Sequence, residues 1–261
     1  MQYVEVKVHD NVATILLDRA SVANALNPQL LEDLATAFSD VHQEKRVQAV
    51  VLAASGKHFC SGMDMKVLSE IAEMPEANAQ QEWFSLWQRL TELLEQMLRF
   101  PKPVVAAIDG GAIGAGFGLA LACDIIVPTT QAYFSAVAVR RGLVGGATSA
   151  LLSFRCGGAI AARMLLTGLP VKPDEANQLG LCLPAVSDDQ IWVRAKEIAN
   201  QCTMAPREAV QATKRMLNES IGETLLSQLS IGAANSATAC TTESAAEGIK
   251  SFLENRDPKW P

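Results

Sequence analysis

The sequence contains no block of lysine and arginine, no C-x-x-C pair, and no apolar stretch of membrane-spanning length without a charge or glycine break. A net charge of −6 without a basic cluster argues against nucleic acid or an anionic membrane surface as a partner. The six cysteines fit buried free thiols in a reducing compartment better than a disulfide framework. Because the first residues carry neither a basic nor an apolar signal region, we expect a cytoplasmic protein.

Nucleotide-binding and serine-nucleophile motifs are also missing. Neither the G-x-x-x-x-G-K-[ST] phosphate loop nor the G-x-S-x-G elbow occurs in the chain. Residues 114–118 (GAGFG) differ from the dinucleotide fingerprint, because the third small residue has the wrong offset and no acidic residue follows at the required distance. The few histidines, His9, His42 and His58, fall where surface or structural roles are favoured.

What the chain does contain is a regular alternation of strand-like and helix-like segments. Its 261 residues, 49% hydrophobic and 19% charged, suit one large domain or one domain with a small appendage. Strands are predicted at residues 4–8, 12–17, 47–53 and 104–108. Asn27 before Pro28 predicts the start of a helix. Continuous apolar strands between helices indicate an α/β fold with largely parallel pairing.

The C-terminal part differs from the rest, because the pattern from residue 205 onward is wholly helical. We therefore divide the chain into an α/β core, residues 1–200, and a helical assembly region, residues 201–261. A helical tail after an α/β body is typical of an element that joins subunits.

Two glycine-bearing turns carry most of the functional signal. Residues 59–64 (FCSGMD) and 110–118 (GGAIGAGFG) each follow an apolar, β-branched run and precede a helical pattern. A strand-to-helix turn leaves backbone N–H groups unpaired at the start of the helix. Two such turns on neighbouring strands could direct two N–H groups at one oxygen, which is an oxyanion hole. Taken alone, Gly116 and Gly118 are equally well explained by close packing of a helix on a sheet.

Residues 83–97 repeat apolar side chains every three or four positions, which is the spacing of an amphipathic helix. Trp83 and Trp87 either pack into the core or form the wall of a pocket for an apolar group. Glu82 is the best-placed carboxylate for acid/base chemistry in this region, with a solvated helix face as the alternative.

Several motifs in order resemble the enoyl-CoA hydratase/isomerase (crotonase) superfamily. Residues 59–66 (FCSGMDMK) are similar to its F-x-[AS]-G-x-D-[LIM]-K signature, and residues 102–125 look like its second signature. Residues 17–27 resemble its first strand–turn–helix, while residues 205–215 and 247–256 resemble its tail. The resemblance extends over nearly the whole chain and is therefore far more specific than a single glycine run.

This resemblance implies a crotonase-like spiral of strand–strand–helix units with a helical C-terminal region that packs a homotrimer or hexamer. It implies an acyl-CoA thioester substrate, with coenzyme A as part of the substrate, no permanently bound cofactor and no metal. The backbone N–H groups of Met63 and Ala115 would form the oxyanion hole. The residues expected along the coenzyme A track are Val22, Ala23, Ser61, Asp64, Met65 and Lys66. For Lys66, an ordinary solvated helix lysine remains the alternative.

The chain departs from the family pattern where acid/base groups are needed. Hydratases of the family use two glutamates, and the resemblance places these positions at Gly118 and Ala138. Neither residue can carry a proton, so the two-glutamate mechanism cannot operate. Arg140, with Arg141 beside it, either holds a substrate carboxylate or faces solvent. The substrate pocket is predicted from Trp83, Trp87, Ala138 and Arg140.

Three functions remain open on this sequence. The first is an enzyme that keeps the oxyanion hole and forms the enolate by losing a leaving group, as a lyase, decarboxylase or unusual isomerase. The second is a catalytically silent oligomer that binds CoA thioesters. The third is a true hydratase that uses Glu82. A carboxylate, phenol or imidazole near the hole would favour the enzymes over the silent binder.

Overall fold

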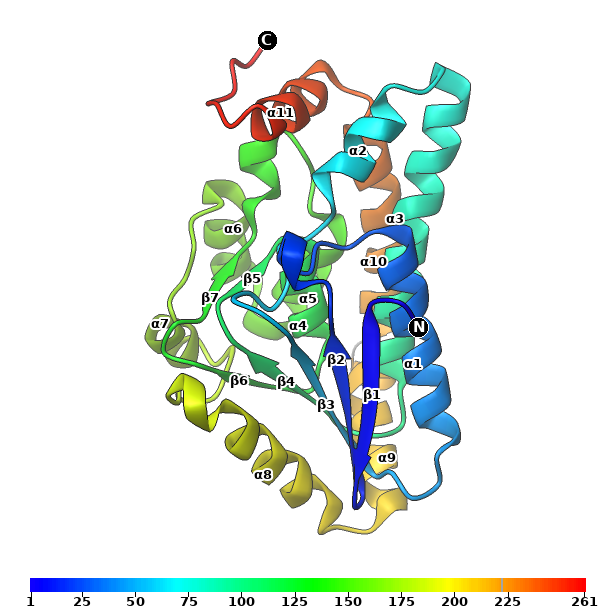
Figure 1. Ribbon diagram of the computed structural model, residues 1–261, viewed down its shortest axis with the longest axis vertical. Coiled ribbons are helices and arrows are strands. Elements are labelled where there is room, and N and C mark those ends of the chain that lie inside the picture. The colour runs from blue at the N-terminus through cyan, green and yellow to red at the C-terminus, as the bar shows by residue number, and fades with distance from the viewer. Residues whose placement is uncertain (222) are drawn as a thin grey trace.

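A five-stranded sheet lies at the centre of the molecule, which the computed structural model describes over residues 1–221 and 223–261 (Figure 1). The strand order is β1-β2-β3-β4-β6, with β1 antiparallel to β2 and the remaining neighbours parallel. Its strands are β1 (Val4–His9), β2 (Val12–Leu17), β3 (Ala49–Ala54), β4 (Val104–Ile108) and β6 (Ile125–Pro128). A second, parallel pair joins β5 (Gly111–Ile113) to β7 (Tyr133–Ser135).

Helices cover both faces of the large sheet. The long ones are α1 (Pro28–Gln43), α3 (Glu76–Arg99), α8 (Ile191–Thr203) and α10 (Glu223–Ala239). The others are α2 (Met65–Ala72), α4 (Ala115–Ala122), α5 (Gly146–Cys156), α6 (Gly158–Thr167), α7 (Pro173–Gln178), α9 (Arg207–Arg215) and α11 (Glu243–Leu253). Short turns of 3-10 helix occur at η1 (Ala20–Val22), η2 (Val137–Arg141) and η3 (Asp188–Gln190), and a π-helix spans Met216–Ile221.

The predicted helix start at Asn27 is confirmed in atomic detail. The Asn27 side-chain oxygen accepts the Leu30 N–H at 2.9 Å, and Pro28 occupies the first helical position, where no N–H donor is needed. The mixed strand–helix alternation read from the sequence is likewise the observed architecture.

Two hydrophobic layers hold the sheet. On one face, α8 contributes Ile191, Ala195 and Ile198 to a small cluster with alternate strand residues (Figure 1). On the other face, a larger core contains the buried sides of α1, α3, α4 and α5. Because β3 and β4 are covered on both faces, they read as continuous apolar runs rather than alternating ones.

The C-terminal helices share the main core. Leu225 and Leu229 of α10 and Ile249 of α11 belong to the same hydrophobic cluster as the α/β body. α10 packs along α3 and α5, and α11 packs on α2 and η2. The boundary drawn at residue 200 falls inside α8, which runs to Thr203, and the assembly role of the following region stays a prediction. Across the described residues, no helix is both long and apolar enough to cross a bilayer.

A buried ion pair fastens α9 to the sheet. Lys214 Nζ lies 2.7 Å from Asp124 Oδ2 and donates to the Lys102 carbonyl at 3.1 Å. The same Asp124 oxygen accepts the Val104 N–H at 2.7 Å. With only 6% of the Lys214 side chain exposed, this charge depends on its partner, because an unpaired buried charge is strongly unfavourable.

We expect Asp124→Asn to lower the free energy of unfolding by about 3–5 kcal/mol, since it leaves the Lys214 ammonium buried without a counter-charge. Urea denaturation followed by circular dichroism measures the change. The matched control is Glu197→Gln, which breaks the exposed Arg194–Glu197 pair and should cost less than about 1 kcal/mol. Equal urea denaturation midpoints for the two variants would contradict the expectation.

Candidate active site

The two glycine turns are hydrogen-bonded to each other. The Cys60 N–H donates to the Gly111 carbonyl at 3.0 Å, and the Ile113 N–H donates to the Cys60 carbonyl at 2.9 Å. This makes a parallel bridge between Cys60 and Ala112, just before the functional part of each turn. The tertiary structure thus aligns two segments that lie about fifty residues apart in the chain.

Two backbone amides are left without a protein acceptor in this arrangement. The peptide groups before and after the Met63 Cα are both held by Leu26. The Asp64 N–H donates to the Leu26 carbonyl at 2.9 Å, and the Leu26 N–H donates to the Gly62 carbonyl at 2.7 Å. Ala115 is the first residue of α4, where N–H groups have no partner within the helix. Among the residues that the structure describes, neither the Met63 nor the Ala115 N–H donates to another residue.

Gly62 brings these amides close together. Its φ of +94° lies in the left-handed region, and a Cβ at this position would sit 2.8 Å from the Ile113 carbonyl oxygen and 3.4 Å from the Ala115 nitrogen. Gly116 confirms the packing interpretation of the second turn, because a Cβ there would lie 2.4 Å from the Cys60 carbonyl oxygen.

A cavity of about 880 Å³ opens beside the turns. Its lining includes seven residues that the sequence predicted: Val22, Ser61, Met63, Asp64, Met65, Lys66 and Arg140. It also includes Tyr133 and Ser135 of β7, and residues of α11 and the segment that follows it, which sequence reasoning did not assign to a site. We call this cavity the cleft.

Asp64 both lines the cleft and stabilises the start of α2. Its Oδ2 lies 2.7 Å from Arg19 Nη1, and its Oδ1 accepts the Lys66 N–H at 3.0 Å as the N-cap of α2. Arg19 also donates to the Ala25 carbonyl at 2.8 Å. Asp64 therefore fixes the start of α2, which carries Met65 and Lys66 into the cleft.

The Arg140 side chain is held at the C-terminus of α6. Its Nε donates to the Thr167 carbonyl at 2.6 Å, at the C-terminus of α6, and its aliphatic stem lies against Gly168. The neighbouring Arg141 guanidinium lies 4.7 Å from the centre of the Phe252 ring. Within the described ranges neither arginine is paired with a carboxylate, so both add positive potential to the cleft.

Three of the predicted residues lie elsewhere. Trp83 and Trp87 are buried in the main core and do not line the cleft, because the inner face of α3 packs against the rest of the core. Glu82 is exposed on α3, since it is rotated about 100° from Trp83 around the helix axis. The predicted roles of the two tryptophans as a pocket wall and of Glu82 as an acid/base thus have no support from the lining of this cleft.

Ala23, Ala115 and Ala138 do not contribute side chains to the cleft lining. The Ala115 N–H nevertheless has no acceptor among the described residues, at the start of α4. Ala138 lies near Gly145, at whose position a Cβ would be 3.3 Å from the Ala138 methyl group.

Gly118 lies beside a buried threonine. A Cβ on Gly118 would lie 3.4 Å from Thr148 Oγ1, and the Thr148 hydroxyl donates to the Gly114 carbonyl at 3.0 Å. Thr148 was not singled out from the sequence, because nothing local marks a buried threonine in a helix as close to a distant turn. The region is thus occupied by a hydroxyl that supports the second turn.

The histidines do not supply the missing acid/base group. His58 Nδ1 accepts the Gly111 N–H at 3.2 Å and so braces the second turn. His9 lies in β1 and His42 in α1, and neither is in the cleft lining. In residues 1–221 and 223–261, no group of three or more His, Cys, Asp or Glu could hold a metal ion.

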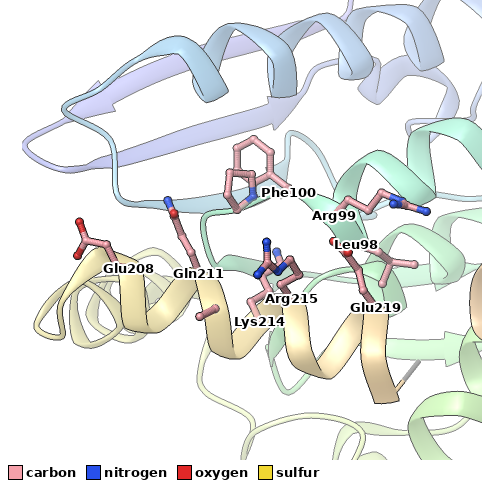
Figure 2. A pocket seen from close by; sticks show the side chains of 10 residues that line it. Leu98, Arg99, Phe100, Glu208, Gln211, Lys214, Arg215 and Glu219 are labelled. Atoms are coloured by element: carbon pink, nitrogen blue, oxygen red, sulfur yellow. The ribbon is translucent and has the colours of Figure 1, made fainter. Parts of the chain in front are cut away.

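A second cavity, of about 240 Å³, lies between the end of α3 and α9 (Figure 2). It is lined by Phe100, Lys214 and neighbouring charged residues, and contains none of the predicted site residues. Because Lys214 is already paired with Asp124, we assign this cavity to packing at the end of α3.

Cys60 lies in the first turn but is not a nucleophile. Burial raises the pKa of its thiol to about 12, and its Sγ donates to the Asn24 carbonyl at 3.1 Å. We expect no alkylation of Cys60 by iodoacetamide at pH 8 in the folded protein, and full alkylation after unfolding, as measured by peptide mass spectrometry. Rapid labelling of the native protein would contradict this expectation.

Gly62→Ala should destabilise the protein more than a glycine substitution that carries backbone strain alone. The control is Gly180→Ala, where φ is +73° and nothing lies within 4 Å of the added methyl group. We expect a loss of about 1–2 kcal/mol for the control from left-handed strain, and a clearly larger loss for Gly62→Ala from the added clash. Thermal melting of both variants measures the difference, and equal shifts would show that the turns are not in tight contact.

The family model described as enoyl-CoA hydratase/isomerase matches residues 7–261. The human enoyl-CoA hydratase domain-containing protein 2, mitochondrial, is 31% identical over 255 residues, covering 95% of this chain and 85% of that protein. Crystal structures of an enoyl-CoA hydratase from Mycobacterium avium and an enoyl-CoA hydratase/isomerase from Mycobacterium paratuberculosis, both 26% identical, superimpose with TM-scores of 0.85 and 0.86. They cover 99% and 95% of this chain, and 99% and 98% of their own. The predicted fold is thereby confirmed.

Proposed function

This chain belongs to the enoyl-CoA hydratase/isomerase family, and from that membership we propose that it processes an acyl-CoA thioester through a backbone oxyanion hole. The observation that carries the proposal is the pair of uncommitted amides, Met63 and Ala115, at adjoining turns beside a cleft of about 880 Å³. Side-chain identity matters little for this role, because the backbone supplies the donors.

The hole stabilises charge that develops on the thioester oxygen. As an enolate forms, the oxygen accepts hydrogen bonds from both amides, and the N-terminus of α4 adds the positive end of a helix dipole. These donors are fixed by the hydrogen bonds of their neighbours, so they need little reorganisation when the charge appears. One such donor is worth about 10²–10³-fold in rate.

The enolate must be generated without a pair of glutamates. The two positions hold Gly118 and Ala138, with Thr148 beside Gly118. We propose that a bond at the α-carbon breaks and leaves its electron pair on the thioester as an enolate. In a decarboxylation the departing group is carbon dioxide. In a retro-aldol cleavage the departing group is an aldehyde or ketone, and the proton of the β-hydroxyl group passes to solvent as the bond breaks. The α-carbon then takes a proton, for which the side chains of Ser61, Tyr133 and Ser135 offer hydroxyl groups in the cleft, and solvent restores the donor.

The cations of the cleft suit an anionic ligand. Arg140 uses its Nε for the Thr167 carbonyl, so its terminal guanidinium nitrogens can bind an anion. Lys66 lies at the start of α2 and also lines the cleft. Coenzyme A carries phosphates, and a substrate that loses carbon dioxide carries a carboxylate, so both parts of the ligand have a suitable partner. Val22, Ser61 and Met65 line the same track.

A panel of CoA thioesters tests this function, with binding measured by thermal shift and consumption by mass spectrometry. The panel includes crotonyl-CoA, saturated acyl-CoAs, and malonyl-type and β-hydroxyacyl-CoAs. We expect binding of several members and cleavage of an α-carboxylated or β-hydroxylated member. Binding without turnover of any member would favour the silent binder, and absence of all binding would overturn the proposal.

Ala115→Pro should remove one of the two N–H donors of the proposed oxyanion hole while leaving α4 in place. Proline is well tolerated at the first position of a helix, where its missing N–H makes no helical hydrogen bond. We expect kcat to fall about 10²–10³-fold with a much smaller change in thioester affinity.

The matched control for that substitution is Ala115→Ser, which keeps the N–H and should retain kcat within a few-fold. Steady-state kinetics on the substrate identified in the panel distinguish the variants. Equal activity of the proline and serine variants would exclude Ala115 from the hole.

A further inference from the structure

One wall of the cleft comes from the end of α11 and the segment that follows it. Its lining residues are Phe252, Leu253, Asp257, Pro258 and Trp260. We propose that Glu247 and Arg256 are positioning residues that hold residues 257–260 against the cleft, and that Trp260 contacts the bound thioester. The inference rests on the proposed function, because it takes the ligand to be a CoA thioester. We call residues 256–260 the tail.

The tail is tied to α11 by a single carboxylate. Glu247 Oε1 accepts Arg256 Nη1 at 2.5 Å and the Lys259 backbone N–H at 2.6 Å, and Oε2 accepts Arg256 Nη2 at 2.9 Å. A bidentate arginine–carboxylate pair fixes orientation as well as distance. One side chain on α11 therefore sets the position of a backbone atom next to Trp260.

A sharp turn brings the tail back to that carboxylate. Asn255 adopts the left-handed conformation, with φ of 51°, directly after the end of α11. Asparagine tolerates this region better than most residues. The Arg256 N–H then donates to the Ser251 carbonyl at 3.0 Å, which closes the turn. The chain thus reverses and runs back beside the helix.

α11 packs directly against η2. A Cβ on Gly248 would lie 1.9 Å from the Arg141 carbonyl oxygen, so only glycine allows this approach. On the next turn of α11, Phe252 packs under the Arg141 guanidinium. Since Val137, Arg140 and Arg141 of η2 line the cleft, the helix and the tail are rigidly joined to its other walls.

The resulting surface suits an extended amphipathic ligand. Phe252, Leu253, Pro258 and Trp260 offer apolar area, while Arg140 and Arg141 supply charge nearby. Trp260 is 48% exposed, so its indole ring has free surface to stack on a base or cover an alkyl arm. The hydrogen bonds from Arg256 lower the pKa of Glu247 to about 2, so the tether keeps its charge at any pH used for assay.

The experiment compares Glu247→Ala with Glu254→Ala in the full chain. Both remove a carboxylate partner of Arg256, since Glu254 Oε2 accepts its Nε at 2.6 Å, but only Glu247 also holds Lys259. We expect Glu247→Ala to raise the KM and Kd for the CoA thioester about tenfold, which is about 1.4 kcal/mol, with kcat within twofold. Glu254→Ala should change each constant less than twofold.

Lys259→Pro provides a second route, because it deletes the tethering N–H and leaves the Glu247–Arg256 pair intact. The affinity of this variant for the CoA thioester should also fall, as expected for Glu247→Ala. Circular dichroism melting confirms that each variant is folded before its constants are compared.

The indole contact is tested separately. Trp260→Ala should weaken binding about tenfold, and Trp260→Phe should recover most of it. Trp192→Ala, at an exposed position of α8 outside the cleft, should have no effect. Quenching of tryptophan fluorescence by a CoA thioester should be lost in Trp260→Phe. Adenosine 3′,5′-bisphosphate and a pantetheine thioester, used as separate probes, show which part of the ligand meets the indole.

Failure of this inference is distinct from failure of the proposed function. If the wild-type protein binds CoA thioesters and the Glu247, Lys259 and Trp260 variants bind them equally well, the tail has no role and the oxyanion-hole proposal stands. If the wild-type protein binds no CoA thioester, both are overturned.

Discussion

The parallel bridge between Cys60 and Ala112 is the interaction on which the site depends. It joins the turn after β3 to the turn after β4, and it leaves the Met63 and Ala115 amides as the uncommitted donors beside it. An oxyanion hole requires donors whose positions are set before charge appears. In the proposed oxyanion hole, this constraint would come from neighbouring backbone groups that are already paired.

The other walls of the cleft are fixed by charge and close packing. Asp64 uses Arg19 and the N-terminus of α2 to place Lys66, while the Thr167 carbonyl holds Arg140. The protein has a net charge of −6, yet its cleft is lined by three cations, Lys66, Arg140 and Arg141, against two carboxylates, Asp64 and Asp257. Asp64 is already paired with Arg19. An acidic chain can therefore offer a suitable surface to an anionic thioester.

The sequence predicted strands β1 to β4, the capped helix at Asn27 and the two turns, because each depends on local periodicity or on residues with restricted backbone preferences. It did not predict the short strands β5, β6 and β7. It also predicted seven residues that line the cleft. Glu82, Trp83 and Trp87 do not line the cleft, although the helix that contains them was correctly expected. Periodicity shows that one face of a helix is buried, but it does not distinguish the core from a ligand cavity.

By itself, the sequence determined the α/β order of elements, the glycines that allow two sharp turns, and the absence of carboxylates at Gly118 and Ala138. These follow from the chemistry of single residues and their near neighbours. Only the tertiary structure decided that Thr148 supports the second turn, that α11 seats on η2 through Gly248, and that Trp260 reaches the cleft. Those contacts join residues far apart in the chain, and they arise from the packing of elements whose relative positions no local pattern encodes.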